Sequence, residues 1–288
     1  MNNADTDKVF GGSIAKLYET YLVPLIFEPY AADLVNRLAS RPLSRVLEIA
    51  AGTGVVTRNL ASVLPERVSI VATDLNQAML DQASVVGTRR PVEWRQADAM
   101  QLPFADGTFD AVVCQFGVMF FPEKPKAFSD ARRVLRPGGV FIFNVWDRIK
   151  ENKFADTVTT ALESLFPKDP PRFMARTPHG YYDRPTIEQD LANGGFRKSA
   201  QIATVAARSR AESPRVPAIA YCQGTPPTER DRGARRFAAR RSHRHRGRSD
   251  RSAVRAGICG RQDSGAHCHH RKLTVANCAC CARPHNGG

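Results

Sequence analysis

The sequence predicts an α/β fold with a doubly wound, mostly parallel sheet. Short apolar runs alternate with helical patterns between residues 46 and 145, which is typical of repeated strand–helix–strand units. The turn Gly52-Thr53-Gly54 directly follows the first apolar run, and Asp74 ends the second run twenty residues after Gly54. Because right-handed crossovers bring the carboxyl ends of parallel strands to one edge of the sheet, we expect this turn and this acid to form one site there.

Each predicted element follows from apolar spacing and from the residues that end it. Apolar runs predict strands at 46–50, 68–73, 109–116 and 140–145. We also predict a short strand at 92–96, and a looser alternation predicts one at 198–209. Helical spacing predicts helices at 13–38 with an interruption at Pro24, and at 57–64, 76–85, 126–134, 152–166, 183–193 and 217–222. We interpret Arg136-Pro137-Gly138-Gly139 as the stop signal of the helix at 126–134.

Charge divides the chain into two parts near residue 225. The chain has 288 residues and a net charge of +14, but residues 226–288 hold 15 of its 42 Lys and Arg and only 4 of its 28 Asp and Glu. The preceding part therefore has the near-neutral balance of a globular domain. We predict an N-terminal helical lid at 1–40, a ligand-binding domain at 41–225, and a basic tail of low order at 226–288.

The basic tail admits three interpretations. Its arginine pairs would suit a nucleic-acid-binding arm. His267-Cys268-His269-His270 and Cys278-Ala279-Cys280-Cys281 are metal-ligand types, but their spacing matches no usual paired pattern, so we predict no metal site. We favour the third, a coding sequence read out of frame from near residue 225, because Arg, His and Cys rise together while aromatic residues nearly vanish. On this hypothesis the tail is disordered and the sheet lacks its last antiparallel strand.

Two acids distinguish between the nucleosides that such a site could bind. Asp74 stands where a carboxylate accepts hydrogen bonds from two ribose hydroxyls. Thr57 occupies the position of the third glycine in the dinucleotide fingerprint, and that glycine allows close helix packing beneath a pyrophosphate. The carboxylate of Glu48 would repel a diphosphate but would attract a sulfonium and an amine. These residues favour S-adenosylmethionine over a nicotinamide dinucleotide.

Residues 44–145 resemble the class I S-adenosylmethionine-dependent methyltransferases of the small-molecule type, which include the quinone-biosynthesis C-methyltransferases. The resemblance covers roughly the first 225 residues, less clearly at the ends of this stretch. Ala50 replaces the family's first glycine, a change that we expect to tighten the turn. The resemblance rests on segments in the family's order and spacing: Glu48–Gly54, Asp74, Asp98-Ala99, Leu102-Pro103-Phe104, Phe109–Val113 and Leu135–Gly139.

The resemblance implies a set of cofactor-binding residues at the sheet edge. Asp74 would hold the ribose, Met79 and Asp98 would contact the adenine, and Gln115 would border the transferred methyl group. Because the N-terminal helices of the family often close over the cofactor, Phe10, Tyr18 and Tyr21 are lid candidates. The complete predicted cofactor set is Glu48, Ala50, Gly52, Gly54, Asp74, Asn76, Met79, Asp98, Ala99 and Gln115.

The predicted activity is in-line transfer of the sulfonium methyl group to a small-molecule acceptor, with positioning and water exclusion as the protein's main tasks. No constellation demands a catalytic base, so we assign no catalytic residue, and we interpret His179 as a loop histidine. Aromatic residues such as Phe116, Phe120 and Phe121 suggest an apolar or aromatic acceptor. The alternatives are a nicotinamide-dependent oxidoreductase and a nucleic-acid-binding protein that acts through the tail.

Membrane and secretion signals are not found in the sequence. No apolar run reaches the roughly 18 residues of a membrane span, and the first eight residues lack the pattern of a secretion signal. We therefore expect a cytoplasmic protein with no membrane partner and no nucleic-acid partner except through the tail. The identity of the acceptor and the oligomeric state stay open.

Overall fold

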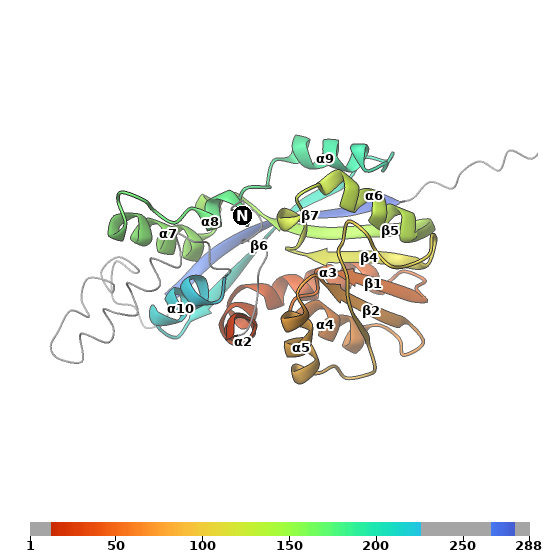
Figure 1. Cartoon of the computed structure of the whole chain (residues 1–288), viewed down its shortest axis with the longest axis horizontal. Coiled ribbons are helices and arrows are strands. Elements are labelled where there is room, and N and C mark those ends of the chain that lie inside the picture. Colours follow the sequence, from red (N-terminus) through yellow and green to blue (C-terminus); the bar gives the residue numbers. More distant parts are fainter. Residues whose placement is uncertain (1–12, 226–265, 280–288) are drawn as a thin grey trace, which may run out of the picture.

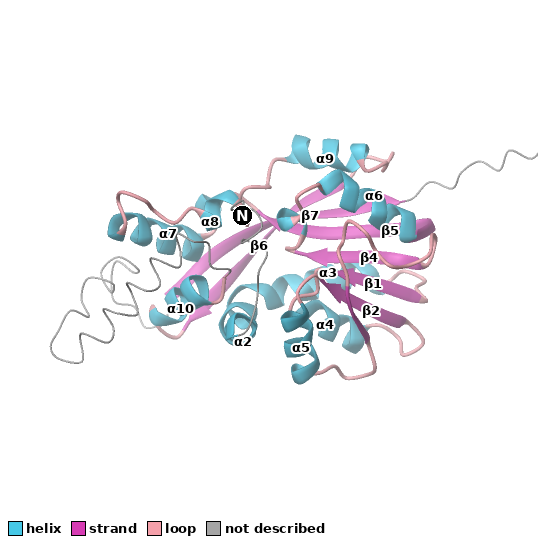
Figure 2. Cartoon of the chain, viewed as in Figure 1, coloured by secondary structure: helices cyan, strands magenta, loops and turns pink. Residues whose placement is uncertain are grey.

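A seven-stranded sheet forms the centre of the molecule. The computed structural model describes residues 13–225 and 266–279. The strand order is β3-β2-β1-β4-β5-β7-β6, with helices on both sides of the sheet (Figure 1, Figure 2). The predicted α/β fold with its doubly wound sheet is confirmed. The parallel strands are β1 (Arg45–Ile49), β2 (Ser69–Asp74), β3 (Glu93–Gln96), β4 (Phe109–Gln115) and β5 (Leu135–Trp146).

The helices lie close to the predicted ranges. After α6 (Lys124–Val134), the predicted stop signal becomes the first part of β5, where the register with β4 shifts between Phe109 and Ala111. The helices are α2 (Ser13–Leu17), α3 (Glu28–Ala39), α4 (Val55–Val63), α5 (Gln77–Val86), α6 (Lys124–Val134), α7 (Lys153–Leu165), α8 (Phe173–Arg176), α9 (Arg184–Asn193) and α10 (Arg215–Gln223), with 3₁₀ turns η2 (Val118–Phe120) and η3 (Ile149–Glu151).

The predicted interruption of the N-terminal helix at Pro24 is wrong. Pro24 lies inside η1 (Tyr18–Phe27), a π-helical segment that runs without a break from α2 into α3. Proline lacks the N–H that an α-helix needs and its ring crowds the preceding turn. The wider π-helical spacing shifts the hydrogen-bond ladder and makes room for the ring. Residues 13–39 therefore form one continuous helical element.

The expectation that the sheet lacks its last antiparallel strand is wrong. β7 (Ala266–Ala279) lies between β5 and β6 (Gln201–Ala211) and pairs antiparallel with both. The expectation of a tail without structure is thus wrong for these residues. The segment Leu273-Thr274-Val275 has the β-branched residues that favour strands, but the composition of the whole tail hides this short pattern.

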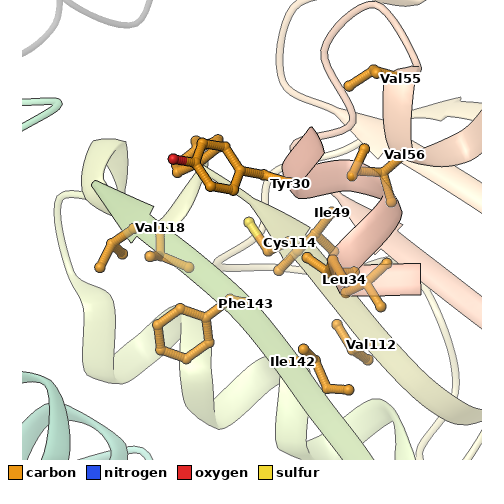
Figure 3. Close-up of a cluster of buried hydrophobic side chains, with 14 of the residues drawn as sticks. Tyr30, Leu34, Ile49, Val55, Val56, Val112, Cys114, Val118, Ile142 and Phe143 are labelled. Carbon is orange, nitrogen blue, oxygen red and sulfur yellow. The ribbon is translucent and has the colours of Figure 1, made fainter. Parts of the chain in front are cut away.

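The core is formed where helices pack on the central strands. Figure 3 shows Tyr30 and Leu34 of α3 beside Ile49 and Cys114 at the ends of β1 and β4. All four side chains are buried. In α6, the ring of Phe128 lies 5.3 Å from that of Phe143 of β5. This packing fixes the carboxyl ends of the parallel strands, from which the candidate site is built.

Some predictions fall on parts of the chain outside the described residues. These are Phe10 and the start of the predicted lid at residues 1–12, and the tail at 226–265 and 280–288. Whether the tail is read out of frame stays a prediction. Among the residues that the structure describes, no helix is both long enough and apolar enough to cross a bilayer.

Candidate active site

A cavity opens at the carboxyl ends of the parallel strands, beneath the N-terminal helices. Its wall combines loops that follow β1, β2, β3, β4 and β5 with side chains from η1, α8 and α10. Of the predicted site residues, nine line this cavity: Tyr18, Ala50, Gly52, Asp74, Asn76, Met79, Asp98, Ala99 and Gln115. Glu48, Gly54 and Tyr21 are described by the structure but do not line it.

Asp74 is the polar centre of the cavity wall. Its Oδ2 accepts a hydrogen bond from the Gly52 N–H at 2.8 Å, and its Oδ1 accepts one from the Asn76 N–H at 2.8 Å. Burial raises the pKa of Asp74 above its ordinary value, and these backbone donors partly offset the effect. Each carboxylate oxygen has two lone pairs, so Asp74 can accept further hydrogen bonds from a ligand.

The turn after β1 contains three residues with left-handed backbone. Gly52 and Gly54 have φ values of 57° and 84°, and Ala50 has φ of 53°. A Cβ atom on Gly54 would lie 2.9 Å from the Trp94 ring of β3, so this glycine is required by packing and not by a ligand. Gly52 faces the cavity, where only the Met79 methyl group lies near the position of a Cβ.

Glu48 lies below this turn, outside the cavity wall. Its side chain is buried, and its Oε2 accepts a hydrogen bond from the Thr57 hydroxyl at 2.5 Å. Burial raises the pKa of Glu48 to about 8, although the Thr57 hydroxyl lowers it. The carboxyl group is therefore largely neutral at pH 7 in the described state. Thr57, which marked a departure from the dinucleotide fingerprint, is thus the hydrogen-bond partner of Glu48.

The loops after β3 and β4 add two further polar groups to the cavity wall. Asp98 lies at its edge, where Oδ1 accepts a hydrogen bond from the Met100 N–H at 2.9 Å. Gln115 ends β4, and its Oε1 accepts a hydrogen bond from Asn144 Nδ2 at 3.2 Å. Its Nε2 donates to the Phe27 carbonyl of η1 at 3.4 Å, which joins η1 to the sheet.

The family whose model matches this chain and two relatives that resemble it are all methyltransferases. Residues 47–143 match the model of a family described as "Methyltransferase domain". The chain is 32% identical over 171 residues to the ubiquinone/menaquinone biosynthesis C-methyltransferase UbiE of Ectopseudomonas mendocina, covering 55% of this chain and 67% of that protein. It is 30% identical to the protein of the same name from Escherichia fergusonii, covering 64% of this chain and 86% of that protein.

The chain belongs to the class I S-adenosylmethionine-dependent methyltransferases.

Solved structures share this fold at low sequence identity. The phosphoethanolamine N-methyltransferase 2 of Haemonchus contortus, in complex with S-adenosyl-L-methionine, has a TM-score of 0.55 at 16% identity and covers 96% of this chain and 60% of that one. The YcgJ protein of Bacillus subtilis has a TM-score of 0.53 at 15% identity and covers 86% of this chain and 97% of that one. For this chain, the cofactor is S-adenosylmethionine and the reaction is methyl transfer to a small-molecule acceptor.

The cavity of the methyltransferase suits a cationic cofactor. Two acids, Asp74 and Asp98, belong to its wall, and no Lys or Arg is among the described residues that line it. A dinucleotide would bring a diphosphate that such a wall leaves without a counter-charge, whereas the sulfonium and ammonium groups of S-adenosylmethionine gain from nearby carboxylates. The residues present therefore fit the cofactor of the family, and the nicotinamide alternative is not supported.

Aromatic side chains form a second part of the methyltransferase cavity wall. The rings of Phe116 and Trp146 are stacked, with centroids 3.9 Å apart and planes 4° apart. Phe116 has left-handed backbone with φ of 52°, which is rare for a bulky residue. Such strain is frequent at functional sites. Phe27 of η1 packs on both rings, at 5.5 Å from Phe116 and 5.9 Å from Trp146.

His179 and Asn152 are cavity residues that the sequence analysis does not predict as site residues. Both are buried, at 4% and 1% exposure, and both line the cavity. They come from segments far along the chain from the glycine turn, and no local pattern reveals that the fold returns them to it. The flanking Pro178 and Gly180 support the interpretation of His179 as a loop residue, but they give no sign of its burial.

Proposed function

We propose that this methyltransferase methylates an apolar, aromatic small molecule. The observation that carries the proposal is the division of the cavity wall into two kinds of surface. Asp74 ends β2 and Asp98 lies just after β3, whereas η2 and α8 contribute Phe120 and Phe173, whose ring centroids lie 6.3 Å apart. The names of the two relatives refer to quinone biosynthesis, which supports an acceptor built on a flat ring.

The polar surface would hold the cofactor. In this proposal Asp74 accepts hydrogen bonds from the ribose hydroxyls, Asp98 accepts one from the adenine amine, and Met79 and Ala99 pack on the adenine ring. When bound, S-adenosylmethionine supplies a methyl group on a positively charged sulfur, which activates that carbon for in-line displacement. Glu48 would act indirectly, by holding the start of α4 through Thr57 beneath the glycine turn.

The apolar surface would orient the acceptor and exclude water. Leu22, Ile26 and Phe27 of η1 are buried and close the cavity from the side of the lid. Holding two reactants in line accounts for much of the rate of a displacement at carbon, and excluding water prevents loss of the cofactor by hydrolysis. We therefore propose that the segment 13–39 acts as the lid and that the chain's main catalytic contribution is positioning.

An acceptor panel tests this proposal. The purified chain is incubated with S-adenosylmethionine and either hydroquinones and phenols or the polar amine phosphoethanolamine, and release of S-adenosylhomocysteine is measured. We expect turnover with aromatic acceptors and none above background with phosphoethanolamine. A preference for the polar amine would contradict the proposal.

A further inference from the structure

His179 is fixed in the cavity wall by two hydrogen bonds. Its ring Nδ1 lies 2.8 Å from the carbonyl oxygen of Asp147, which follows β5, and its backbone N–H donates to the Met174 carbonyl at 2.9 Å. The ring packs beside Trp146, with centroids 5.9 Å apart. Asn152 Nδ2 donates to the same Asp147 carbonyl at 3.1 Å. The imidazole therefore has a defined position and orientation.

The Asp147 carbonyl determines which ring nitrogen carries the proton. A carbonyl oxygen only accepts hydrogen bonds, so Nδ1 of His179 must be the donor. Burial lowers the pKa of His179 to about 4, although the hydrogen bond to Asp147 raises it, so the ring is neutral near pH 7. In a neutral imidazole the other nitrogen has a free lone pair. Nε2 is therefore a hydrogen-bond acceptor.

This acceptor has no donor in the part of the chain that the structure describes. His179 lines the cavity, where its ring packs beside Trp146, and the neighbouring Asn152 donates to the Asp147 carbonyl and not to the imidazole. A ligand that fills the cavity beside Nε2 without offering a donor would leave this acceptor unpaired, which costs free energy. A ligand that brings a donor to Nε2 avoids this cost.

We propose that His179 is the specificity-determining residue for the methyl acceptor, and that its Nε2 accepts a hydrogen bond from a hydroxyl group on an aromatic ring. This inference rests on the proposed function, because it assumes that the aromatic surface holds the acceptor. A neutral hydroxyl fits better than an ammonium group, because the described residues around His179 include no carboxylate side chain that lines the cavity there. The ring orients the acceptor, and no proton transfer to it is required.

Binding of a matched pair of probes tests the proposal. 1-Naphthol carries a hydroxyl group on an aromatic ring. In 1-methoxynaphthalene a methyl group replaces the hydrogen of that hydroxyl, so the molecule has no donor. Both are titrated by calorimetry into the full chain saturated with S-adenosylhomocysteine. We expect the wild-type chain to prefer 1-naphthol by at least about tenfold, as for a site built around a substrate hydroxyl. The variant His179→Phe, which keeps a ring of similar shape, should lose this preference, and His179→Gln, which keeps an acceptor atom, should retain part of it.

The outcomes separate this inference from the proposed function. If S-adenosylhomocysteine does not bind, the function itself is contradicted. If S-adenosylhomocysteine binds but the wild-type chain binds neither probe, or binds both equally, the role of His179 is overturned. The same conclusion follows if His179→Phe keeps the preference for 1-naphthol. A second measurement does not depend on the variants folding. Long-range ¹⁵N–¹H NMR of the wild-type chain should show a buried neutral histidine with its proton on Nδ1, and a proton on Nε2 would overturn the proposal.

Discussion

The methyl group of Ala50 occupies the space that a side chain on Gly117 would need. A Cβ atom built on Gly117 would lie 2.4 Å from the Cβ of Ala50 and 2.7 Å from the Sγ of Cys114. Ala50 holds the first position of the glycine turn with φ of 53°, a conformation that glycine adopts without strain. The departure from the family's first glycine is therefore matched by a glycine in the loop after β4.

This relationship predicts an asymmetric pair of substitutions. Gly117→Ala should destabilise the fold by about 1–3 kcal/mol, because overpacking forces backbone shifts. Ala50→Gly should be neutral or stabilising by about 0.5 kcal/mol, since relief of left-handed strain exceeds the added chain entropy. The double variant should recover part of the loss, but not all, because Cys114 still crowds the new methyl group. Urea unfolding of the four chains measures this, and equal losses in the single and double Gly117 variants would contradict the fit.

Asp74 should dominate cofactor affinity. Asp74→Ala removes the carboxylate that both lines the cavity and accepts the Gly52 N–H. We expect S-adenosylhomocysteine to bind the wild-type chain in the micromolar range and the variant at least about tenfold more weakly, a loss of roughly 1.4 kcal/mol. Asp81→Ala is the matched control, because Asp81 is an exposed acid of α5 that contacts Gln77 only on the surface. Equal affinities of wild type and Asp74→Ala in calorimetry would remove Asp74 from the site.

Glu48 should make stability fall as pH rises. Its pKa is about 8 in the folded chain against an ordinary value of 4.5, so the folded state binds more protons than the unfolded state between these values. Stability therefore decreases with pH across this window. Glu48→Gln keeps an acceptor for Thr57 but cannot ionise, and it should stabilise the chain by roughly 1–4 kcal/mol at pH 8 while changing little at pH 4. Thermal unfolding of both chains across this pH range is the measurement. Parallel curves of stability against pH would show that the pKa of Glu48 is not raised.

Arg58 joins the glycine turn to η1, which is part of the proposed lid. Its Nη1 donates to the Thr53 carbonyl at 2.7 Å, and its Nη2 pairs with Glu19 Oε1 at 2.8 Å. Both side chains are mostly buried, at 24% and 17% exposure. A double-mutant cycle with Glu19→Gln and Arg58→Met should give a coupling free energy of about 1 kcal/mol. Arg58→Met should also weaken S-adenosylhomocysteine binding more than Glu19→Gln does, because only Arg58 contacts the turn; the reverse order would assign the effect to the lid alone.

β7 should be required for a stable sheet. A chain that ends at Thr225 loses the strand that pairs with both β5 and β6, and we expect it to aggregate or to melt well below the full chain. A chain that ends at Ala279 keeps β7 and serves as the control. Thermal unfolding and size-exclusion chromatography compare them. If the shorter chain is as stable as the longer one, the segment 266–279 contributes nothing to the fold.

Local sequence pattern predicts the parallel half of this molecule well. The strands β1, β2 and β4 are short, mostly apolar runs, and Asp74 and Asp98 reach the cavity because Asp74 ends β2 and Asp98 lies just after β3. The same reasoning cannot place Glu48 and Gly54, whose contacts with Thr57 and Trp94 lie below the turn. Glu48 lies inside a strand, where a one-residue difference decides which face it points to.

The antiparallel half and the distant wall of the cavity depend on tertiary structure. β7 is stabilised by backbone pairing on both sides, which compensates for a composition that predicts no strand. His179 becomes a cavity residue only because the loop between α8 and α9 returns to the Asp147 carbonyl. The pairing of β7 and the contact between His179 and Asp147 both join segments far apart in the chain. A window of neighbouring residues therefore predicts neither of them.

The position of β7 between two strands that precede it also has a consequence for biosynthesis. β5 and β6 are complete by residue 211, but the strand that joins them ends at Ala279. During translation the nascent polypeptide must therefore carry the edges of β5 and β6 that face β7 unpaired until residue 279 has been synthesised. Such edges are the surfaces through which partly folded chains associate, so the speed of synthesis between residues 211 and 279 bears directly on the yield of native enzyme.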